Sequence, residues 1–244
     1  AGDVFDLFDL EVILLSNFPS GTSGSAVVNV TSSPTEFSSV DGATYGAQEI
    51  LRWNSTVAPG SVPLNLGESR TVVTSVVGPT DALPAAGILN FTITASTSLT
   101  GMVGITSPET TATFRVIIET VIDGELEDSP LTAGVPGVEN NATLVLTNNG
   151  NALSDYTLSS PGLPDWIVDL TPNAVTALAP EVGTWPSGID SVFQNIVVTA
   201  TPPTDARADI VHEIEILVFD GEGRFVDNGT ASFVLDEVIG ASIE

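Results

Sequence analysis

The chain has 244 residues, of which 42% are hydrophobic, 31 are acidic and 5 are basic, so its formal net charge is −26. This hydrophobic share excludes a disordered chain, and no apolar run approaches the ~18 residues that a membrane-spanning helix requires. The acidic surface would repel phosphate backbones and anionic lipids, so we expect no nucleic-acid partner and no insertion of this chain into a membrane.

The charged residues are also unusual in kind. All the basic residues are arginines, and the chain has neither lysine nor cysteine. Without cysteine, disulfides and thiol chemistry are excluded, so stability must come from core burial, helped by ions or by assembly. An excess of carboxylates without lysine is expected of a halophilic protein, because concentrated salt screens carboxylate repulsion. An ordinary acidic secreted protein is the alternative.

The first element in chain order is residues 3–15, the most apolar and aromatic stretch. One interpretation makes it the first strand of the sandwich that follows. The other makes it a polymerisation segment, a donor strand that completes the sheet of the next subunit through backbone hydrogen bonds. Its apolar side chains include Val4, Phe5, Leu7, Phe8 and Leu10. Residues 1–3 carry no initiator methionine and no basic region, which we expect of a terminus left by signal-peptide removal.

Beyond this stretch, the chain consists of short runs rich in Val, Ile, Thr and Phe in which apolar and polar residues alternate. Clusters of Gly, Pro, Ser, Asn and Asp separate these runs at the spacing of a β-sandwich. No segment of about 10–12 residues keeps a helical period, so we predict an all-β protein. The clearest predicted strands are residues 26–31, 71–77, 88–95, 112–120, 142–147, 195–200, 210–219 and 231–235.

Three sites in the second half of the chain have the residues of tight turns. They are Asn148–Asn151, Asp220-Gly221 and Asp227-Asn228-Gly229. Asn-Gly and Asp-Gly accept the positive φ angles that tight hairpins require. We therefore predict a turn at each site, with the final strand following Gly229.

An internal repeat defines the domain organisation. Pro79-Thr80-Asp81-Ala82 recurs as Pro203-Thr204-Asp205-Ala206, and residues 111–116 (TATFRV) recur as 230–235 (TASFVL). The copies lie about 120 residues apart, which is the length of one small domain. We predict two tandem immunoglobulin-like β-sandwich domains, residues 1–122 and 123–244.

The segment that joins the two predicted domains itself recurs. Residues 121–127 read VIDGELE, and residues 238–244 read VIGASIE after the equivalent strand of the second domain. The joining segment therefore reappears where a third domain would begin. Either the chain continues as a longer array, or this tail docks onto a neighbouring subunit.

The second domain resembles a known family over residues 141–218. The order is NATLVLTNNGNALSDYTLSS, then LPDWIVDLTPNAVTALAP, then QNIVVTATPPTDA. It resembles the CARDB-like immunoglobulin-fold modules of archaeal and bacterial surface proteins, with their TNxGN turn, LPxxW turn and PPxDA strand end. The resemblance implies a tandem surface module with Trp166 in the core between its sheets, and it says little about function. The first domain keeps less of the pattern, since the region around Trp53 departs from it.

Catalytic groups are scarce. The single histidine, His212, lies in a predicted strand beside Glu213 and Glu215, and we interpret it as a strand-surface residue. No Ser or Thr has a second His, a Lys or a Cys available as its base, so we predict that the chain is not an enzyme.

Two acidic clusters have ligands of the kind that calcium prefers, although neither has the EF-hand order. The first lies between the predicted domains, and the second lies in a hairpin. The first comprises Asp123, Glu125, Glu127 and Asp128, and the second Asp220, Glu222 and Asp227. We expect no organic cofactor; calcium that stiffens the linker and a merely solvated acidic loop both remain open.

Five asparagines stand in Asn-x-Ser/Thr sequons, namely Asn29, Asn54, Asn90, Asn141 and Asn228. Asn228 lies in a predicted turn, where a glycan would project freely, whereas Asn29 and Asn90 lie in predicted strands and need outward-facing side chains. We expect at least one sequon to be occupied if the source organism glycosylates its surface.

These observations favour a non-catalytic extracellular structural protein. We predict the subunit of a cell-surface filament, a pilus-like fibre, or an S-layer-type array, whose partners are copies of itself joined head to tail. The alternative from another class is a carbohydrate-binding or enzyme-tethering accessory module, in which exposed Trp53 and Trp185 would stack on surface glycans. A virion surface protein of a halophilic virus would have the same composition.

Overall fold

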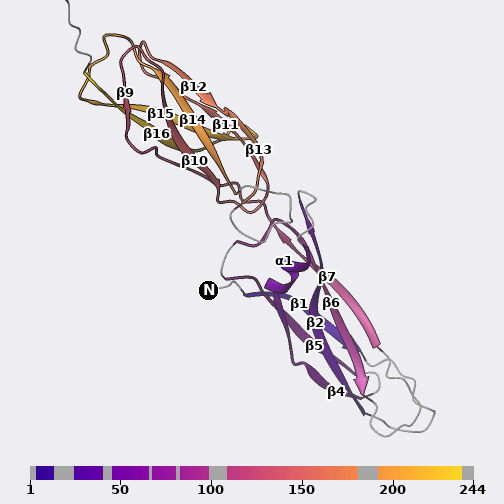
Figure 1. The fold of residues 1–244 in the computed structure, drawn as a ribbon. Coiled ribbons are helices and arrows are strands. Elements are labelled where there is room, and N and C mark those ends of the chain that lie inside the picture. Colours follow the sequence, from indigo (N-terminus) through magenta and orange to yellow (C-terminus); the bar gives the residue numbers. More distant parts are fainter. Residues whose placement is uncertain are drawn as a thin grey trace, which may run out of the picture. The chain divides into compact units, whose positions relative to one another are not determined.

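The structure is a computed structural model that describes residues 4–13, 25–40, 46–65, 68–80, 83–98, 109–180 and 192–237. The chain divides into two compact units, Ala1–Glu119 and Thr120–Glu244, here called unit 1 and unit 2. Figure 1 shows that each unit is built almost entirely of strands. This confirms the prediction of an all-β protein made of immunoglobulin-like sandwiches.

Unit 1 places its described strands in two sheets. One has the order β1-β5-β3 and the other the order β4-β2-β6-β7. The strands are β1 (Val4–Ile13), β2 (Ser25–Ser39), β3 (Asn54–Ala58), β4 (Ser61–Asn65), β5 (Ser69–Val77), β6 (Gly87–Ser98) and β7 (Glu109–Ile118). Both sheets contribute side chains to one core, which includes Val30, Leu64, Val72 and Ile93.

Unit 2 also consists of two sheets, in the orders β12-β14-β10-β8 and β13-β11-β15-β16-β9. The strands are β8 (Gly124–Glu127), β9 (Thr132–Gly134), β10 (Asn140–Asn148), β11 (Ser154–Ser159), β12 (Ile167–Thr171), β13 (Ala174–Leu178), β14 (Phe193–Thr201), β15 (Val211–Asp220) and β16 (Phe225–Leu235). Alternate residues of β10, β14 and β15 are buried, among them Leu144, Ile196 and Ile214. Each such side chain contributes roughly 1.5–3 kcal/mol by its burial.

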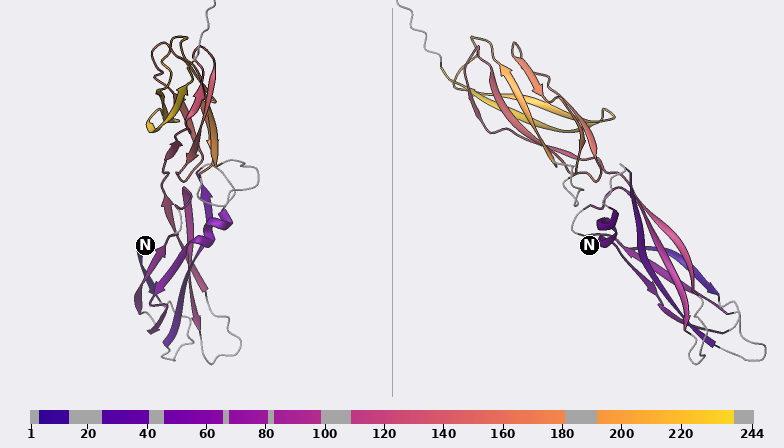
Figure 2. Two further views of the ribbon diagram at one scale, coloured as in Figure 1. Left: turned by 60° about the vertical axis from the view of Figure 1, so that its left-hand side comes forward. Right: turned by 45° about the vertical axis from the view of Figure 1, so that its right-hand side comes forward.

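The two units share one strand order. If β1 to β7 are matched in sequence order with β10 to β16, every pairing of unit 1 recurs in unit 2. For example, β5 lies between β1 and β3, just as β14 lies between β10 and β12. The internal repeat falls on matched elements, since residues 111–116 lie in β7 and residues 230–235 in β16. Figure 2 shows the two layers of strands in each unit.

The eight clearest strand predictions all fall on strands. A helix of seven residues, α1 (Gly46–Arg52), was not predicted, because it is too short to display a helical period. The buried carboxylate of Glu49 holds it, since Glu49 accepts hydrogen bonds of 3.0 Å from both Arg52 and the Trp53 indole. Trp53 is 8% exposed, so the prediction of an exposed Trp53 is wrong.

The predicted turn at Asp227-Asn228-Gly229 is also wrong. β16 runs without interruption through these residues and pairs with β15 along them. The reason is a long-range contact with β8. The Asp227 carboxylate accepts a hydrogen bond from the Leu126 N–H, and Gly229 leaves room for the Leu126 carbonyl. The other two predicted turns are present, at residues 149–151 between β10 and β11 and at residues 221–223 between β15 and β16.

Candidate functional site

The candidate site is the edge of the sandwich that the first strands of unit 2 cover, together with the matching edge of unit 1. In unit 2 this first segment forms β8 and β9, called here the opening strands. β8 pairs antiparallel with β10 of one sheet, and β9 pairs parallel with β16 of the other. The opening strands therefore cross from one sheet to the other and cover the edge between them.

Leu126 anchors β8 in the core. Its side chain is 4% exposed and belongs to the main hydrophobic cluster of unit 2. Its backbone N–H donates a 2.8 Å hydrogen bond to the Asp227 carboxylate. Gly229 is required for this approach, since a Cβ there would lie 2.8 Å from the Leu126 carbonyl oxygen. A residue of β8 thus packs on β16 while the strand pairs with β10.

Tyr156 fixes the start of β8. The Tyr156 hydroxyl donates a 3.0 Å hydrogen bond to the Asp123 carbonyl, and its ring lies where a Cβ on Gly124 would be 2.9 Å away. The side chain is 1% exposed, and this burial raises the pKa of Tyr156 to about 12, with smaller contributions from the charges of Asp123 and Asp220. The Tyr156 hydroxyl is therefore protonated and neutral at neutral pH, as its hydrogen bond to Asp123 requires.

The turn at residues 148–151 holds the backbone that precedes β8. Asn148, which is fully buried, accepts a 2.9 Å hydrogen bond from the Gly150 N–H and donates to the carbonyls of Ala152 and Leu178. The N–H groups of Asn149 and Gly150 donate to the Asp123 carbonyl. The sequence predicts this turn, but its role in seating the opening strand depends on contacts between distant residues.

The segment between β8 and β9 is attached to β16 by hydrogen bonds at Asp128 and Ser129. The Thr230 N–H donates a 2.7 Å hydrogen bond to the Asp128 carboxylate, and the Ser232 N–H donates to the Ser129 hydroxyl. The Ser129 N–H donates in return to the Thr230 carbonyl at 2.9 Å. These bonds occupy the outer edge of β16, which would otherwise be open.

The first predicted calcium cluster is distributed over this segment. Asp128 binds Thr230, and Glu125 accepts a 2.9 Å hydrogen bond from the Asn149 side chain. Asp123 and Glu127 are exposed. Within the described residues, no three His, Asp or Glu side chains form a group that could hold a metal ion. Calcium binding stays a prediction.

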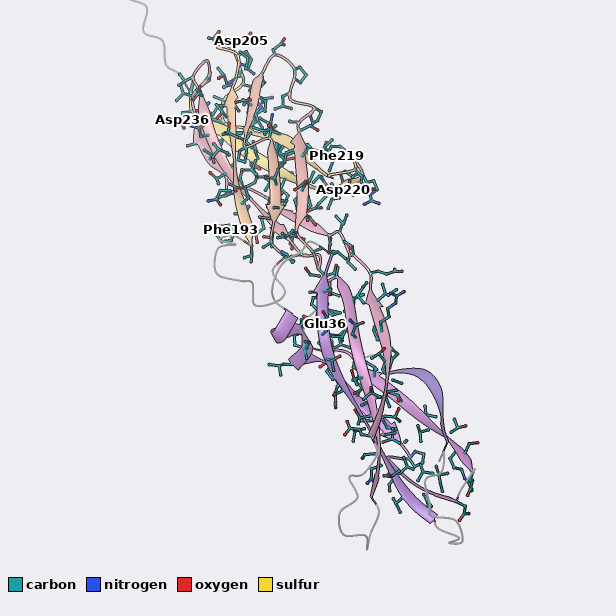
Figure 3. All side chains as sticks on the ribbon, turned by 90° about the vertical axis from the view of Figure 1, so that its right-hand side faces the viewer. Glu36, Phe193, Asp205, Phe219, Asp220 and Asp236 are labelled. Atoms are coloured by element: carbon teal, nitrogen blue, oxygen red, sulfur yellow. The ribbon has the colours of Figure 1, made fainter. Side chains whose placement is uncertain are left out.

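The second acidic cluster divides between two roles. Asp220 ends β15 and, as Figure 3 shows, lies beside Phe219 at the hairpin. Burial raises the pKa of Asp220, but hydrogen bonds from the N–H groups of Arg224 and Glu222 and from the Arg224 guanidinium outweigh it, so this pKa lies below its ordinary value. The guanidinium is 2.7 Å from Asp220 and 3.1 Å from Glu222. Asp227 instead binds β8, so these carboxylates serve the fold.

The five sequons all lie on strands among the described residues. Asn29, Asn54, Asn141 and Asn228 are exposed, and Asn90 is half-buried. The amide nitrogens of Asn90 and Asn228 donate 3.2 Å hydrogen bonds to Glu36, labelled in Figure 3, and to Glu215. A glycan on either nitrogen would replace these bonds. Occupancy of every sequon stays a prediction.

The remaining candidates lie at the margin of the core of unit 2 or outside the described residues. Trp166 is half-buried against the core, with its ring centre 6.2 Å from that of Phe233. His212 is also half-buried, 5.1 Å from the Trp166 ring, and its Nε2 lies 2.8 Å from the Arg207 carbonyl. Trp185 and the stretch around it lie outside the described residues.

In unit 1 no described strand covers the matching site. β1 and β7 are the edge strands that correspond to β10 and β16, and the described residues of unit 1 provide no counterpart of β8 or β9. The predicted polymerisation segment, with Val4, Phe5, Leu7, Phe8 and Leu10, forms β1 and pairs with β5 of the same chain. A strand donated from this end to another copy would have to give up that pairing.

The exposure of β7 shows the effect of the missing cover. Ala231, Phe233 and Leu235 of β16 are fully buried. Their counterparts in β7 are not: Ala112 is exposed, and Phe114 and Val116 are half-buried. Phe114 stacks on Phe91 of the neighbouring strand with ring centres 4.9 Å apart, so its inward face is formed but only partly covered.

Among the described residues, the structure contains no helix long and apolar enough to cross a membrane. No family model matches the chain, and no curated protein matches it. The resemblance to CARDB-like modules therefore stays a prediction.

Several solved structures are similar to the chain at low identity. The sialic acid binding region of a Streptococcus sanguinis adhesin has 10% identity over 96% of this chain and 74% of that one, with a TM-score of 0.35. Domains 4 and 5 of the S-layer protein SbsC have 10% identity over 85% of this chain and 96% of that one, with a TM-score of 0.33.

The SrpA adhesin of Streptococcus sanguinis has 17% identity over 48% of this chain, with a TM-score of 0.33. The match covers 58% of that adhesin chain, which is less than two thirds of it. At such identities and TM-scores, nothing about function, ligands or partners transfers from these proteins to this chain.

Proposed function

We propose that the chain is a non-catalytic structural protein of the cell surface that assembles with copies of itself into a filament or an S-layer-type array. The observation that carries the proposal is the difference between the two units. They have the same order of strands, but the edge that the opening strands cover in unit 2 is not covered by any described residues of unit 1. An uncovered sheet edge is a template for pairing with another strand.

The composition supports a location outside the cell in a saline medium. At about 1 M salt the Debye length falls to ~3 Å, so a net charge of −26 opposes contact between copies much less than it does in dilute buffer. Exposed sequon asparagines such as Asn29 and Asn54 would carry glycans on strand surfaces. We therefore include in the proposal that the protein is extracellular, halophilic and glycosylated.

The glycan-binding alternative loses one of its two aromatic platforms. Trp53 is buried and its indole nitrogen is bound to Glu49, so it has no free face for a sugar ring. Trp185→Ala on a glycan array tests what remains of that alternative: loss of binding by this variant would support it.

The experiment is to follow the intact chain by sedimentation velocity and negative-stain electron microscopy, in low and in molar salt, with and without calcium. We expect a ladder of oligomers or fibres that grows with salt, because screening removes the repulsion between acidic copies. A chain that stays monomeric under every condition, with both ends verified by mass spectrometry, would contradict the proposal.

A further inference from the structure

A counterpart of β8, which the described part of unit 1 does not contain, would have a defined place in the register. β5 and β14 correspond residue by residue through the repeat, so that Val72 matches Ile196 and Val76 matches Ala200. Through their pairings with these strands, Leu10 of β1 matches Leu144 of β10. The outer edge of β10 receives β8, and the same edge of β1 has no partner among the described residues.

A second stretch of the chain has the sequence of β8 and its approach. Residues 238–244, here called the tail, lie outside the described residues and repeat residues 121–127. Val121, Ile122 and Glu127 recur unchanged, and Leu126 is replaced by Ile243. The alternation that buries Gly124 and Leu126 and exposes Glu125 and Glu127 recurs as Ala, Ser, Ile and Glu.

We propose that the tail of one copy occupies, in unit 1 of the next copy, the position that β8 occupies in unit 2. This inference rests on the proposed function and names the strand that performs the assembly. The tail follows β16 as residues 121–127 follow β7, so the junction between copies repeats the connection between the two units. The contact joins unlike surfaces of the two copies, so it is a head-to-tail contact that builds an open filament unless its rotation closes a ring.

The register of β8 predicts the pairing. Leu126 is opposite Leu146 and Glu127 is opposite Val145, both on β10. Transferred to β1, these pairs place Ile243 opposite Val12 and Glu244 opposite Glu11. Ile243 then takes the place of Leu126 and covers the inward face of β7, where Ala112 is now exposed and Phe114 half-buried.

One residue narrows the space for the donated strand in unit 1. Thr110 stands where β16 has Gly229. A Cβ at Gly229 would lie 2.8 Å from the Leu126 carbonyl oxygen of β8. The donated strand therefore lies further from β7 than β8 lies from β16. We expect the association between copies to be reversible, so that oligomers dissociate on dilution.

The test is disulfide capture in the intact chain, whose lack of cysteine makes any introduced pair unique. Glu11→Cys and Glu244→Cys are made separately, one of them isotope-labelled, and the two are mixed in molar salt under mild oxidation. We expect a dimer that joins one labelled and one unlabelled chain. The matched control is Thr71→Cys in place of Glu11→Cys. Thr71 pairs with Glu11 from the β5 side, which puts it about 10 Å from the donated strand, beyond disulfide reach.

A second measurement uses the two faces of the tail. Ile243→Asp should abolish the oligomer ladder, because it places a charge where Leu126 is buried in unit 2. Ser242→Asp, one residue away on the outward face, should leave the ladder intact. Neither change touches a described part of the fold, so loss of folding does not explain the result.

The outcomes separate this inference from the proposed function. Oligomers that persist in Ile243→Asp, without capture between positions 11 and 244 above the Thr71→Cys control, would overturn the donated tail and leave the assembly proposal standing. Capture within a single chain of the doubly substituted protein, with none between chains, would overturn the intermolecular junction. A chain that is monomeric in every variant and condition contradicts both.

Discussion

β7 and β16 are copies of one strand in two environments. Both carry the sequence Thr-Ala-Thr/Ser-Phe, and both lie beside the equivalent neighbouring strand of their own sheet. Phe233 is fully buried, whereas Phe114 is only half-buried. The difference comes from sequence outside the strand, because the opening strands cover β16 and none of the described residues of unit 1 cover β7 in this way.

In this chain the repeat unit of the sequence and the folding unit are offset. The segment that completes unit 2 begins at Thr120, directly after the last strand of unit 1. A copy of this segment follows β16 in turn, at residues 238–244. Under the proposal, each copy of this segment covers the unit that comes after it, and this connectivity joins the copies head to tail.

The largest expected effect is in the pair Phe233→Ala and Phe114→Ala. Removing the fully buried Phe233 should lower the free energy of unfolding of unit 2 by about 3–5 kcal/mol, through lost burial and the cavity left behind. Phe114→Ala should cost unit 1 of the monomer only about half as much, because its ring is already part exposed. Calorimetry of each variant measures the two transitions. Equal losses of unfolding free energy in the two variants would mean that β7 and β16 are equally covered.

Assembly should increase the loss of unfolding free energy caused by Phe114→Ala, which is the smaller of the two losses in the monomer. If the tail covers β7, Phe114→Ala should destabilise the polymer more than the monomer, while Phe233→Ala should affect both alike. Repeating the calorimetry above and below the salt concentration of assembly gives this contrast. A Phe114→Ala cost that is the same in both states would show that β7 stays uncovered in the polymer.

A smaller effect is expected from exchanging the residues at one matched position, which is Gly229 in β16 and Thr110 in β7. Gly229→Thr gives β16 the residue of β7 and forces Leu126 of β8 away from it, which should cost unit 2 about 1–3 kcal/mol. Hydrogen exchange at residues 124–127 should quicken, since β8 loses its close contact with β16. The converse change, Thr110→Gly, should strengthen assembly by making room for the donated strand. Slow exchange in Gly229→Thr would mean that the glycine does not decide how β8 is seated.

The strands could be predicted because alternation is a local signal. The eight clearest runs, such as 71–77 and 210–219, carry the burial pattern in their own residues. The errors have long-range causes. Asp227-Asn228-Gly229 has turn composition, but the carboxylate is bound by Leu126, which is 101 residues earlier, and the glycine accommodates the same residue. Sequence alone does not show that partner.

The candidate site could be predicted only in part, for the same reason. The recurrence of residues 121–127 at the end of the chain is visible in the sequence, and it indicates a shared role. The role itself follows from the place of β8 in the sheet order and from the exposure of β7, which need the folded structure. Trp53 illustrates the limit, because its burial depends on the partner Glu49 in a helix too short to predict.

The smallest expected effect concerns the hydrogen bond from the Tyr156 hydroxyl to the Asp123 carbonyl, which holds the start of β8 in unit 2. Tyr156→Phe keeps the ring and removes the hydrogen bond to the Asp123 carbonyl, which should cost about 0.5–1.5 kcal/mol at neutral pH. The cost should appear in the unfolding transition of unit 2 alone. Phe114→Ala, which acts on unit 1, is the control for that assignment.

The same residue predicts how unit 2 responds to alkali. In the folded chain the pKa of Tyr156 is about 12, against 10.0 for an ordinary tyrosine, so between these pH values the unfolded chain loses a proton that the folded chain keeps. The free energy of unfolding of unit 2 should therefore fall as the pH rises from about 10 to 12, and Tyr156→Phe should lack this contribution. The only other tyrosine is Tyr45, so in Tyr45→Phe the ultraviolet absorbance titration reports Tyr156 alone. A midpoint near 10 in that variant would mean that the hydroxyl reaches water and that β8 is not clamped there, and the contrast between the two units would then rest on Leu126 and Gly229.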